Sequence, residues 1–361
     1  MSFSSAGKLI LVTGASGFIG SSIALRLLSL FHRVRLPFLS FAEAQAWLDQ
    51  YGSVFPGEGR IQPVVLKGTI EEEGAWDEAM EGGVEVVVHC ASPLPMEVKT
   101  SIEQELLRPA IEGTKSLLES AKKSGTVKRF ILTSSAAAYC DWADLAGCEE
   151  TEVRLGNDSW NPLSYEDAAK MPLEKAQDAY GVAKALAEQA AWDFIKQLNV
   201  RFTLTTFGPM YVLGRHPGPG IKSLNDAGST FGMFVDMLFD KKRFPPRKEG
   251  FFRPELFVSI NDVSLAHVLA ALAPPTSACH NKRYILKADQ KSLEQLVRCM
   301  AEQEPRLKGR LPEVEQEEKE EEKARGKFVF EGEDAERDLG FEYEPFDKYV
   351  KEYAKHVFEL S

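Results

Sequence analysis

The sequence predicts an α/β fold of the Rossmann type, in which a doubly wound parallel sheet carries a smaller C-terminal substrate lobe. Short apolar runs alternate with helical patterns through the first two hundred residues, and a glycine-rich turn joins the first run to the first helix. The runs are continuously apolar instead of alternating with polar residues. Such strands are typical of a parallel sheet that helices cover on both faces.

The predicted strands occupy residues 8–13, 33–38, 61–66, 85–89, 128–133 and 201–206. Helical patterns fall between them, at 18–30, 41–50, 101–123 and 176–197. Glycine and proline then predict a loop over 208–228, a late strand is expected at 256–260, and a glutamate-rich solvated segment at 313–322. We therefore expect a dinucleotide-binding core over 1–207 that contains the catalytic residues. Residues 208–361 are expected to form mainly the substrate lobe, interleaved with late core strands.

Composition excludes several function classes. The 361 residues carry a formal net charge of -11, so nucleic acid and anionic lipid surfaces are unfavourable partners. The five cysteines are odd in number and none has C-x-x-C spacing, which argues against disulfides and zinc and favours a reducing cytoplasm. No secretory signal or transmembrane run is evident. We expect no metal, a monomer or homodimer, and a small-molecule substrate.

The turn after the first strand has the sequence T-G-A-S-G-F-I-G, with glycines at 14, 17 and 20. Gly14 permits the tight turn, Gly17 lets the backbone approach a pyrophosphate, and Gly20 lets helix and strand pack closely. The helix that follows offers free N–H groups to phosphates. The turn therefore predicts a dinucleotide site, since it follows an apolar strand and opens a helix.

Later motifs follow in a recognisable order: H-C-A-S-P at 89–93, R-P-A-I-E-G-T at 108–114, L-T-S-S at 132–135, S-W-N-P at 159–162 and Y-G-V-A-K at 180–184. Together with the G-x-x-G-x-x-G turn, they resemble the extended short-chain dehydrogenase/reductases over about residues 8–300. The similarity is to the dihydroflavonol-reductase branch, especially its fungal and yeast aldehyde and ketone (methylglyoxal-type) reductases. The resemblance implies an oxidoreductase, with a role in secondary metabolism.

Tyr180 and Lys184 are four residues apart in a helical pattern, so their side chains can reach one site. A carbonyl that accepts hydride needs a proton donor, and a neighbouring ammonium should lower the pKa of the phenol. The resemblance implies that Lys184 also binds the nicotinamide ribose. Ser135, just after the fifth strand, is preferred over Ser134 for orienting the substrate oxygen, because the family's catalytic serine precedes a small residue, here Ala136.

No acidic residue lies between Gly20 and Glu43, which argues against NAD(H) and favours NADP(H), while NAD(H) stays open as the alternative cofactor. The family's phosphate-binding arginine is replaced by Leu39, and Arg35 is the alternative cation. Two further departures are Thr69, where the family has an adenine-contacting Asp, and Gly208, where it has Asn. The residues expected at the cofactor are Gly14, Ser16, Gly17, Phe18, Ile19, Gly20, Arg35, Thr69, Ile70, Ala91, Ser92, Pro93, Thr133, Tyr180, Lys184, Pro209, Met210 and Val212.

By the same resemblance, the substrate pocket is apolar and aromatic, with one polar focus that suits a hydrophobic aldehyde or ketone and not a nucleotide sugar. The residues expected there are Leu94, Pro95, Met96, Ser135, Tyr139, Tyr180, Met210, Tyr211 and Phe231. Other functions stay open. The same site could serve an epimerase or dehydratase that retains NAD, or a non-redox biosynthetic step, and a non-enzymatic dinucleotide-sensing regulator is the binding-protein alternative.

Overall fold

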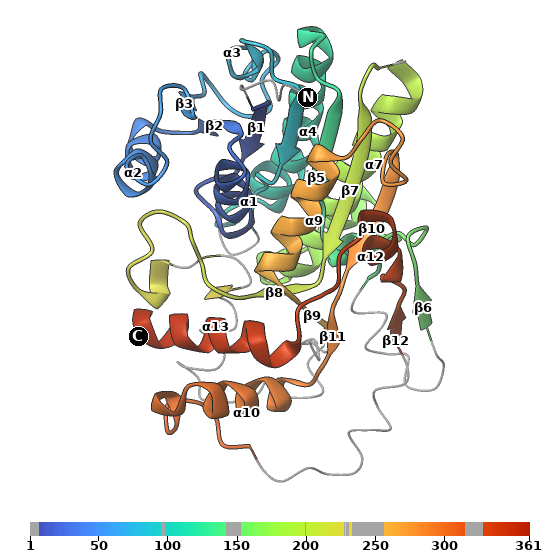
Figure 1. Cartoon of the computed structure of the whole chain (residues 1–361). Helices are drawn as coiled ribbons and strands as arrows, with labels where there is room; N and C mark the ends of the chain where they lie inside the picture. Colours follow the sequence, from blue (N-terminus) through green and yellow to red (C-terminus); the bar gives the residue numbers. More distant parts are fainter. Residues whose placement is uncertain are drawn as a thin grey trace.

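A seven-stranded parallel sheet forms the centre of the molecule (Figure 1). This computed structural model describes residues 7–94, 98–141, 153–198, 200–226, 228, 231–232, 256–314 and 328–361. The strand order β3-β2-β1-β4-β5-β7-β10 reverses direction at β1, so a crevice opens at the carboxyl ends of β1 and β4. The strands are β1 (Leu9–Thr13), β2 (Arg33–Phe38), β3 (Ile61–Val65), β4 (Val86–His89), β5 (Arg129–Thr133), β7 (Thr203–Pro209) and β10 (Lys282–Leu286).

Helices cover both faces of the sheet because successive strand residues point to opposite sides. Ile10 and Val12 belong to the core shared with α1 and α9, whereas Leu9 and Leu11 belong to the core shared with α3, α4 and α7. This explains the continuously apolar strands of the sequence. The helices are α1 (Phe18–Ser29), α2 (Phe41–Tyr51), α3 (Asp77–Met80), α4 (Arg108–Ser124), α6 (Tyr165–Ala169), α7 (Ala176–Leu198) and α9 (Ile260–Leu272).

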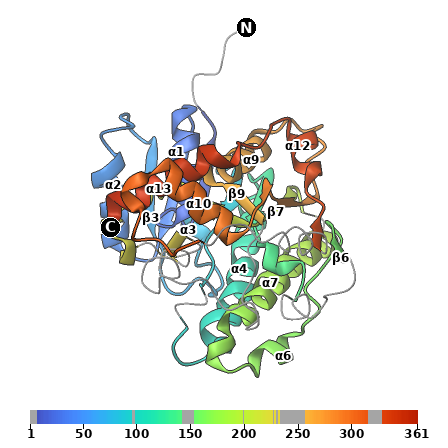
Figure 2. The ribbon, with the colours of Figure 1, turned by 90° about the horizontal axis from the view of Figure 1, so that it is seen from below.

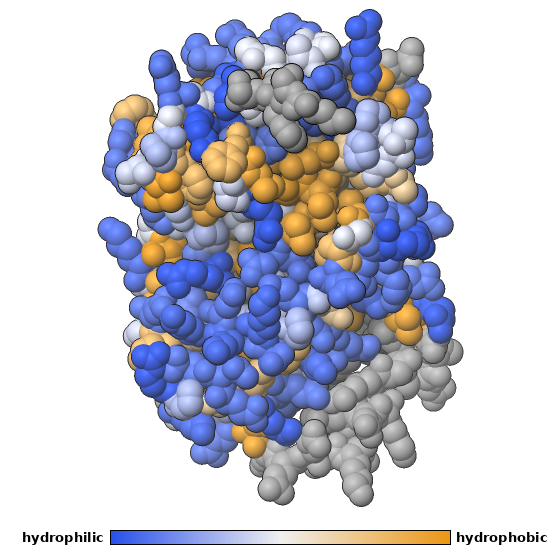
Figure 3. Space-filling model, in the orientation of Figure 1, coloured by the Kyte–Doolittle hydropathy of each residue, from blue (hydrophilic) through white to orange (hydrophobic). Residues whose placement is uncertain are grey.

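The C-terminal part adds two small sheets and a helical layer. Strands β8 (Tyr211–Leu213), β9 (Leu256–Ser259) and β11 (Asp289–Gln290) form one sheet, and β6 (Val153–Leu155) pairs with β12 (Phe328–Phe330) in the other. The helices α10 (Leu293–Gln303), α12 (Glu333–Leu339) and α13 (Phe346–Leu360) complete it. Seen from below, α10 and α13 cross the end of the molecule (Figure 2). Their outer surface is largely hydrophilic, while apolar side chains gather above it (Figure 3).

The sequence prediction differs from the structure in two places. Residues 208–228 were expected to form a loop, but β7 continues to Pro209 and β8 follows at once. Proline is tolerated there because it is the last residue of its strand and needs no ladder N–H. The helical pattern at 101–123 begins with a π-helical turn, Glu103–Leu107, before α4. Most of the glutamate-rich segment lies outside the described residues.

Several expected absences concern only the described part of the chain. Cys90, Cys140, Cys279 and Cys299 are free thiols there, while Cys148 lies outside the described residues. No group of metal-binding side chains occurs in the described ranges. None of the helices described is long and apolar enough to cross a membrane.

Candidate active site

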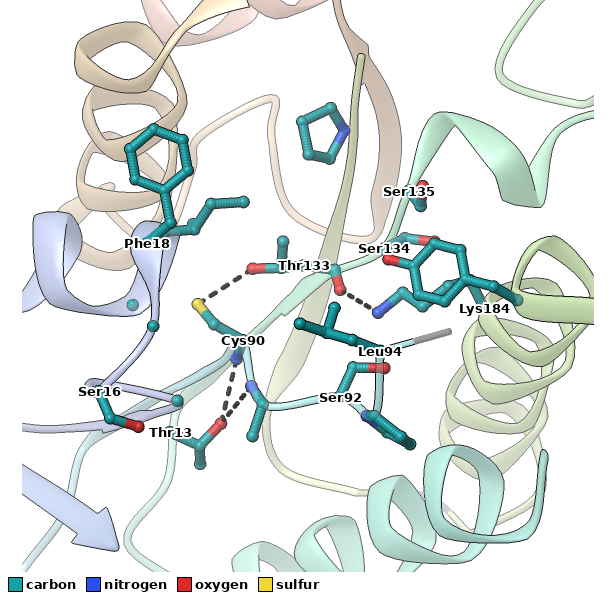
Figure 4. A pocket seen from close by; sticks show the side chains of 18 of the residues that line it. Thr13, Ser16, Phe18, Cys90, Ser92, Leu94, Thr133, Ser134, Ser135 and Lys184 are labelled. Carbon is teal, nitrogen blue, oxygen red and sulfur yellow. Dashed lines mark hydrogen bonds between the residues drawn. The ribbon is translucent and has the colours of Figure 1, made fainter. Parts of the chain in front are cut away.

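A cavity of about 570 Å³ lies at the carboxyl edge of the sheet, where the strand order reverses. Its walls come from the ends of β1, β2, β4, β5 and β7 and from the beginning of α7, so segments far apart in the sequence line one space. Ligands of doubly wound sheets bind at this place. Figure 4 shows the polar groups that converge there, among them Thr13, Ser92, Thr133, Ser135 and Lys184.

The glycine-rich turn forms one wall of the cavity. Gly14 has φ +68°, and a Cβ there would lie 2.9 Å from the Ala91 backbone nitrogen. A Cβ on Gly20 would lie 2.2 Å from the Gly14 carbonyl oxygen, so α1 approaches the turn as closely as the sequence predicted. The Gly17 cap of α1 makes no side-chain cap hydrogen bond. The turn therefore presents backbone N–H groups at a helix N-terminus, which fits a pyrophosphate.

Thr13 ties this turn to the end of β4. Its Oγ1 accepts hydrogen bonds from the backbone N–H groups of Cys90 (3.1 Å) and Ala91 (3.0 Å), as Figure 4 shows. The same oxygen lies 2.8 Å from Nδ1 of buried His89, whose pKa burial lowers to about 3. His89 therefore stays neutral and helps to hold the turn.

The three predicted catalytic side chains meet at the other end of the cavity. The Ser135 hydroxyl lies near enough to the Tyr180 phenol to lower its pKa, and both side chains line the cavity. Lys184 lies one helical turn beyond Tyr180, and its Nζ donates to the carbonyl oxygen of Thr133 at 2.8 Å (Figure 4). All three residues line the cavity that also contains the glycine-rich turn. A hydroxyl pair beside a buried ammonium suits the stabilisation and protonation of a carbonyl oxygen.

The pKa shifts differ from one sequence-based expectation. Burial raises the pKa of Tyr180 to about 12 and outweighs the lowering by the Ser135 hydroxyl, so the net lowering that was expected beside the Lys184 ammonium does not occur in this structure. Burial lowers the pKa of Lys184 to about 8, against the opposing charge of Glu188. The physical reason is desolvation, which disfavours phenolate and ammonium alike. At neutral pH Tyr180 is therefore a neutral phenol that holds a proton to donate.

A buried ion pair supports this end of the cavity. Glu188 is fully buried and accepts hydrogen bonds from Ser134 Oγ (2.6 Å), Thr206 Oγ1 (2.5 Å) and Arg283 Nε (2.8 Å). Two successive turns of α7, at Lys184 and Glu188, are thus hydrogen-bonded to Thr133 and Ser134, and Tyr180 lies one turn before them on the same helix. The position of the segment that carries Ser135, the predicted catalytic serine, therefore depends on α7.

Arg283 on β10 completes the pair. Its guanidinium lies 3.6 Å from the ring centroids of both Tyr139 and Trp160, in a cation–π sandwich. Tyr139 was expected to line the substrate pocket, but it is fully buried and donates to the Tyr284 carbonyl oxygen at 3.1 Å. A Cβ on Gly208 would lie 2.4 Å from this ring, which explains glycine where the family has Asn.

Most predicted residues line the cavity, and a few do not. Those at the cavity are Gly14, Ser16, Gly17, Phe18, Ile19, Gly20, Ile70, Ala91, Ser92, Pro93, Leu94, Thr133, Ser135, Tyr180, Lys184, Pro209, Met210, Tyr211 and Val212. Phe231 is instead buried against Phe18. Pro95 and Met96 lie outside the described residues.

Arg35 and Thr69 do not reach the cavity. Val34, Leu36 and Phe38 pack into the core, so alternation along β2 turns Arg35 to the other face. There its guanidinium donates to Gln62 Oε1 (2.6 Å) and to the carbonyl oxygens of Ala79 and Glu81. Thr69 is exposed, and its N–H and hydroxyl bind Glu72 Oε1. The structure therefore supports a cofactor contact by neither residue.

Sequence reasoning missed some residues of the cavity. Glu43 is the most consequential, because it introduces a carboxylate near the end of β2. Its signal was present: Ser40 and Glu43 have the spacing of a capping box, which fixes a glutamate in the first turn of a helix. Trp76 and Leu66 also line the cavity with apolar surface, together with Ile70. The Trp76 indole N–H donates to the Ile70 carbonyl oxygen at 3.0 Å.

Fold and site together define a dinucleotide-binding α/β protein whose Ser-Tyr-Lys triad faces the cofactor cavity. The chain belongs to the NAD dependent epimerase/dehydratase family, whose model matches residues 10–223. This confirms the resemblance to the extended short-chain dehydrogenase/reductases.

Individual relatives share the fold over most of their length. An uncharacterized oxidoreductase of Schizosaccharomyces pombe is 34% identical over 267 residues, 73% of this chain and 74% of that protein. The NADPH-dependent methylglyoxal reductase of Saccharomyces cerevisiae is 29% identical and covers 84% of both chains. The crystal structure of Gre2 from Candida albicans in complex with NADPH superposes with a TM-score of 0.80, 25% identity and coverage of 98% and 99%.

Proposed function

We propose that the protein reduces a hydrophobic aldehyde or ketone to the alcohol with NADPH as the hydride donor. The observation that carries the proposal is that Ser135, Tyr180 and Lys184 line the same cavity as the glycine-rich turn, with Lys184 one helical turn from Tyr180. The relatives support it, since one is a methylglyoxal reductase that depends on NADPH.

Each residue of the triad has a defined task. Ser135 donates a hydrogen bond to the substrate carbonyl oxygen and orients it toward Tyr180. Tyr180 then transfers its phenolic proton to that oxygen as negative charge develops. The ammonium of Lys184 stabilises the phenolate that remains. When bound, the nicotinamide supplies the hydride that the carbonyl carbon receives.

The substrate wall is apolar beside this polar centre. Leu94, Pro93, Met210 and Tyr211 line it, and Lys184 is the only cationic side chain among the described lining residues. A sugar nucleotide would need cations for its diphosphate, whereas an uncharged carbonyl compound needs only the hydroxyl pair. This favours carbonyl reduction over an epimerase acting on such a substrate.

A nicotinamide absorbance assay tests the proposal. The purified chain is mixed with NADPH and a panel of aliphatic and aromatic aldehydes and ketones, and the decrease in absorbance is followed. We expect turnover that rises with the apolar surface of the substrate. Failure to oxidise NADPH with any member of the panel, by a chain that binds NADPH, would contradict it.

We further propose that the protein is a cytoplasmic monomer or homodimer with a role in secondary metabolism. Size-exclusion chromatography would check the oligomeric state, and fractionation of the producing cells would check the location.

A further inference from the structure

The end of β2 carries the group that a cofactor's adenosine ribose meets in this fold. In dinucleotide-binding sheets, a carboxylate there binds the ribose 2′-hydroxyl of NAD, and an arginine accommodates the 2′-phosphate of NADP. Here Leu39 follows β2 directly, and both Leu39 and Glu43 line the cavity. The subsite therefore holds an aliphatic side chain and a carboxylate.

Glu43 is fixed in place by the start of α2. Its Oε2 accepts the backbone N–H groups of Leu39 (3.1 Å) and Ser40 (3.2 Å), while Ser40 Oγ accepts the Glu43 N–H at 3.2 Å. Within the described residues, the hydrogen bonds that the carboxylate accepts all use this one oxygen and come from residues within four positions. The capping box thus holds a negative charge at the end of β2 independently of any ligand.

The nearby cations of the described chain are engaged elsewhere. Arg35 lies on the far face of the sheet, bound to Gln62 and to the α3 segment. The Arg33 guanidinium donates to the Gly7 carbonyl oxygen at 3.3 Å, and Lys67 pairs with Glu78 at 2.8 Å. A 2′-phosphate at this subsite would meet Glu43 without a positive partner among the described lining residues. The residues present fit a dinucleotide, but they do not form a pocket that selects for a 2′-phosphate.

We propose that Glu43 and Leu39 make the protein a dual-cofactor reductase that binds NADH about as tightly as NADPH. Glu43 accepts a hydrogen bond from the 2′-hydroxyl of NADH and repels the 2′-phosphate of NADPH. Charge-assisted phosphate contacts are worth roughly 1.5–3 kcal/mol, or about ten- to hundredfold in Kd. Their absence removes the selectivity that an arginine at residue 39 would give. The inference rests on the proposed function, since it concerns the cofactor of that same site.

Direct measurements of nucleotide binding test this proposal without requiring turnover. The dissociation constants of NADPH and NADH are measured for the full chain by isothermal titration calorimetry, with no carbonyl substrate present. We expect the two values to agree within about tenfold. Leu39→Arg should tighten NADPH by roughly tenfold or more and leave NADH within about threefold, because the new cation meets only the 2′-phosphate. Glu43→Gln should tighten NADPH and weaken NADH.

Two controls separate charge from helix stability. Ser40→Ala removes the cap but leaves the Glu43 charge, so it should not reproduce the Glu43→Gln effect on the ratio of the two constants. Glu78→Gln removes a carboxylate that pairs with Lys67 outside the cavity and should change neither constant. A native chain that binds NADPH over a hundredfold more tightly than NADH overturns this inference alone. A folded chain that binds neither nucleotide overturns the proposed function as well.

Discussion

The two ends of the cavity are built in different ways. At the redox end, Lys184 and Glu188 of α7 contact residues 51 and 54 positions away, and Glu188 pairs with Arg283 a further 95 positions along the chain. At the adenosine end, the contacts of Glu43 and Thr69 stay within four residues. The geometry of the redox end therefore depends on contacts between distant parts of the chain. The adenosine end depends on contacts between neighbouring residues, so substitutions there should disturb the structure little.

The two ends of the cavity also differ in how far their side chains are exposed to solvent. Lys184, Ser134 and Glu188 are buried, whereas Leu39 is 65% exposed. A buried charge or hydroxyl must keep its partners, because leaving it unsatisfied costs the full desolvation penalty. A change at an exposed local turn costs little. Mutations should consequently have large effects at one end and small, nucleotide-specific effects at the other.

The largest effect is expected from Tyr180→Phe. The variant keeps the ring and loses the proton that the carbonyl oxygen receives, so kcat should fall by about 10²–10⁴-fold. Because no hydrogen bond within the described part of the chain joins the Tyr180 hydroxyl to a core residue, the melting temperature and the Kd for NADPH should change little. Steady-state kinetics and calorimetry check this prediction. Tyr165→Phe is the matched control, because the Tyr165 hydroxyl donates to Glu103 and Tyr165 does not line the cavity. Near-normal turnover by the Tyr180 variant would remove Tyr180 from the mechanism.

The next effect is on stability, at Glu188→Ala. Removing one partner of a buried ion pair strands the other charge and costs about 3–5 kcal/mol. Arg283 would keep only carbonyl and aromatic contacts, and Ser134 would lose its acceptor. Denaturant unfolding measures the loss. The exposed pair Lys115–Glu112 provides the comparison, because Glu112→Ala should cost no more than about 1 kcal/mol. Equal losses at both sites would show that the redox end has no special support.

A pH effect is expected at the redox end alone. The pKa of Lys184 is lowered by burial to about 8, so the ammonium is present below that pH and is lost as pH rises through it. Since the charged form stabilises the Tyr180 phenolate, kcat for reduction should be constant near neutrality and decline above about pH 8, approaching tenfold per unit. Lys184→Arg keeps a charge over this range, so any activity it retains should lose that inflection. A native profile that is flat to pH 10 would show that the charge of Lys184 is not used.

The sequence predicted which residues meet at the redox end, because each of them is marked by a short local pattern. The apolar runs place β1, β2 and β5 within one residue of their observed starts. The glycine spacing and the i, i+4 spacing of Tyr180 and Lys184 are fixed by turn and helix geometry. Ser135 needed only its position after a strand.

The remaining features depend on which way side chains face. Arg35 was a candidate for the phosphate because it lies near the end of β2, yet the core packing of Leu36 and Phe38 turns it away. Glu43 lies in the first turn of α2, beyond the end of β2, and the capping box brings its carboxylate back to the strand end. The Glu188–Arg283 pair joins α7 to β10, so no local pattern could predict it.

The smallest effect is expected at Thr69→Ala. The family resemblance assigns the adenine contact to this position, but here Thr69 is exposed, and its N–H and hydroxyl donate to Glu72 Oε1. Since the hydroxyl touches no lining residue, Kd for both nucleotides should stay within about twofold and unfolding free energy within about 0.5 kcal/mol. Ile70→Ala is the paired variant, because Ile70 does line the cavity beside Trp76 and should weaken both nucleotides together. If Thr69→Ala weakened binding more than Ile70→Ala, the adenosine end would depend on a polar contact at residue 69, and its contrast with the redox end would be lost.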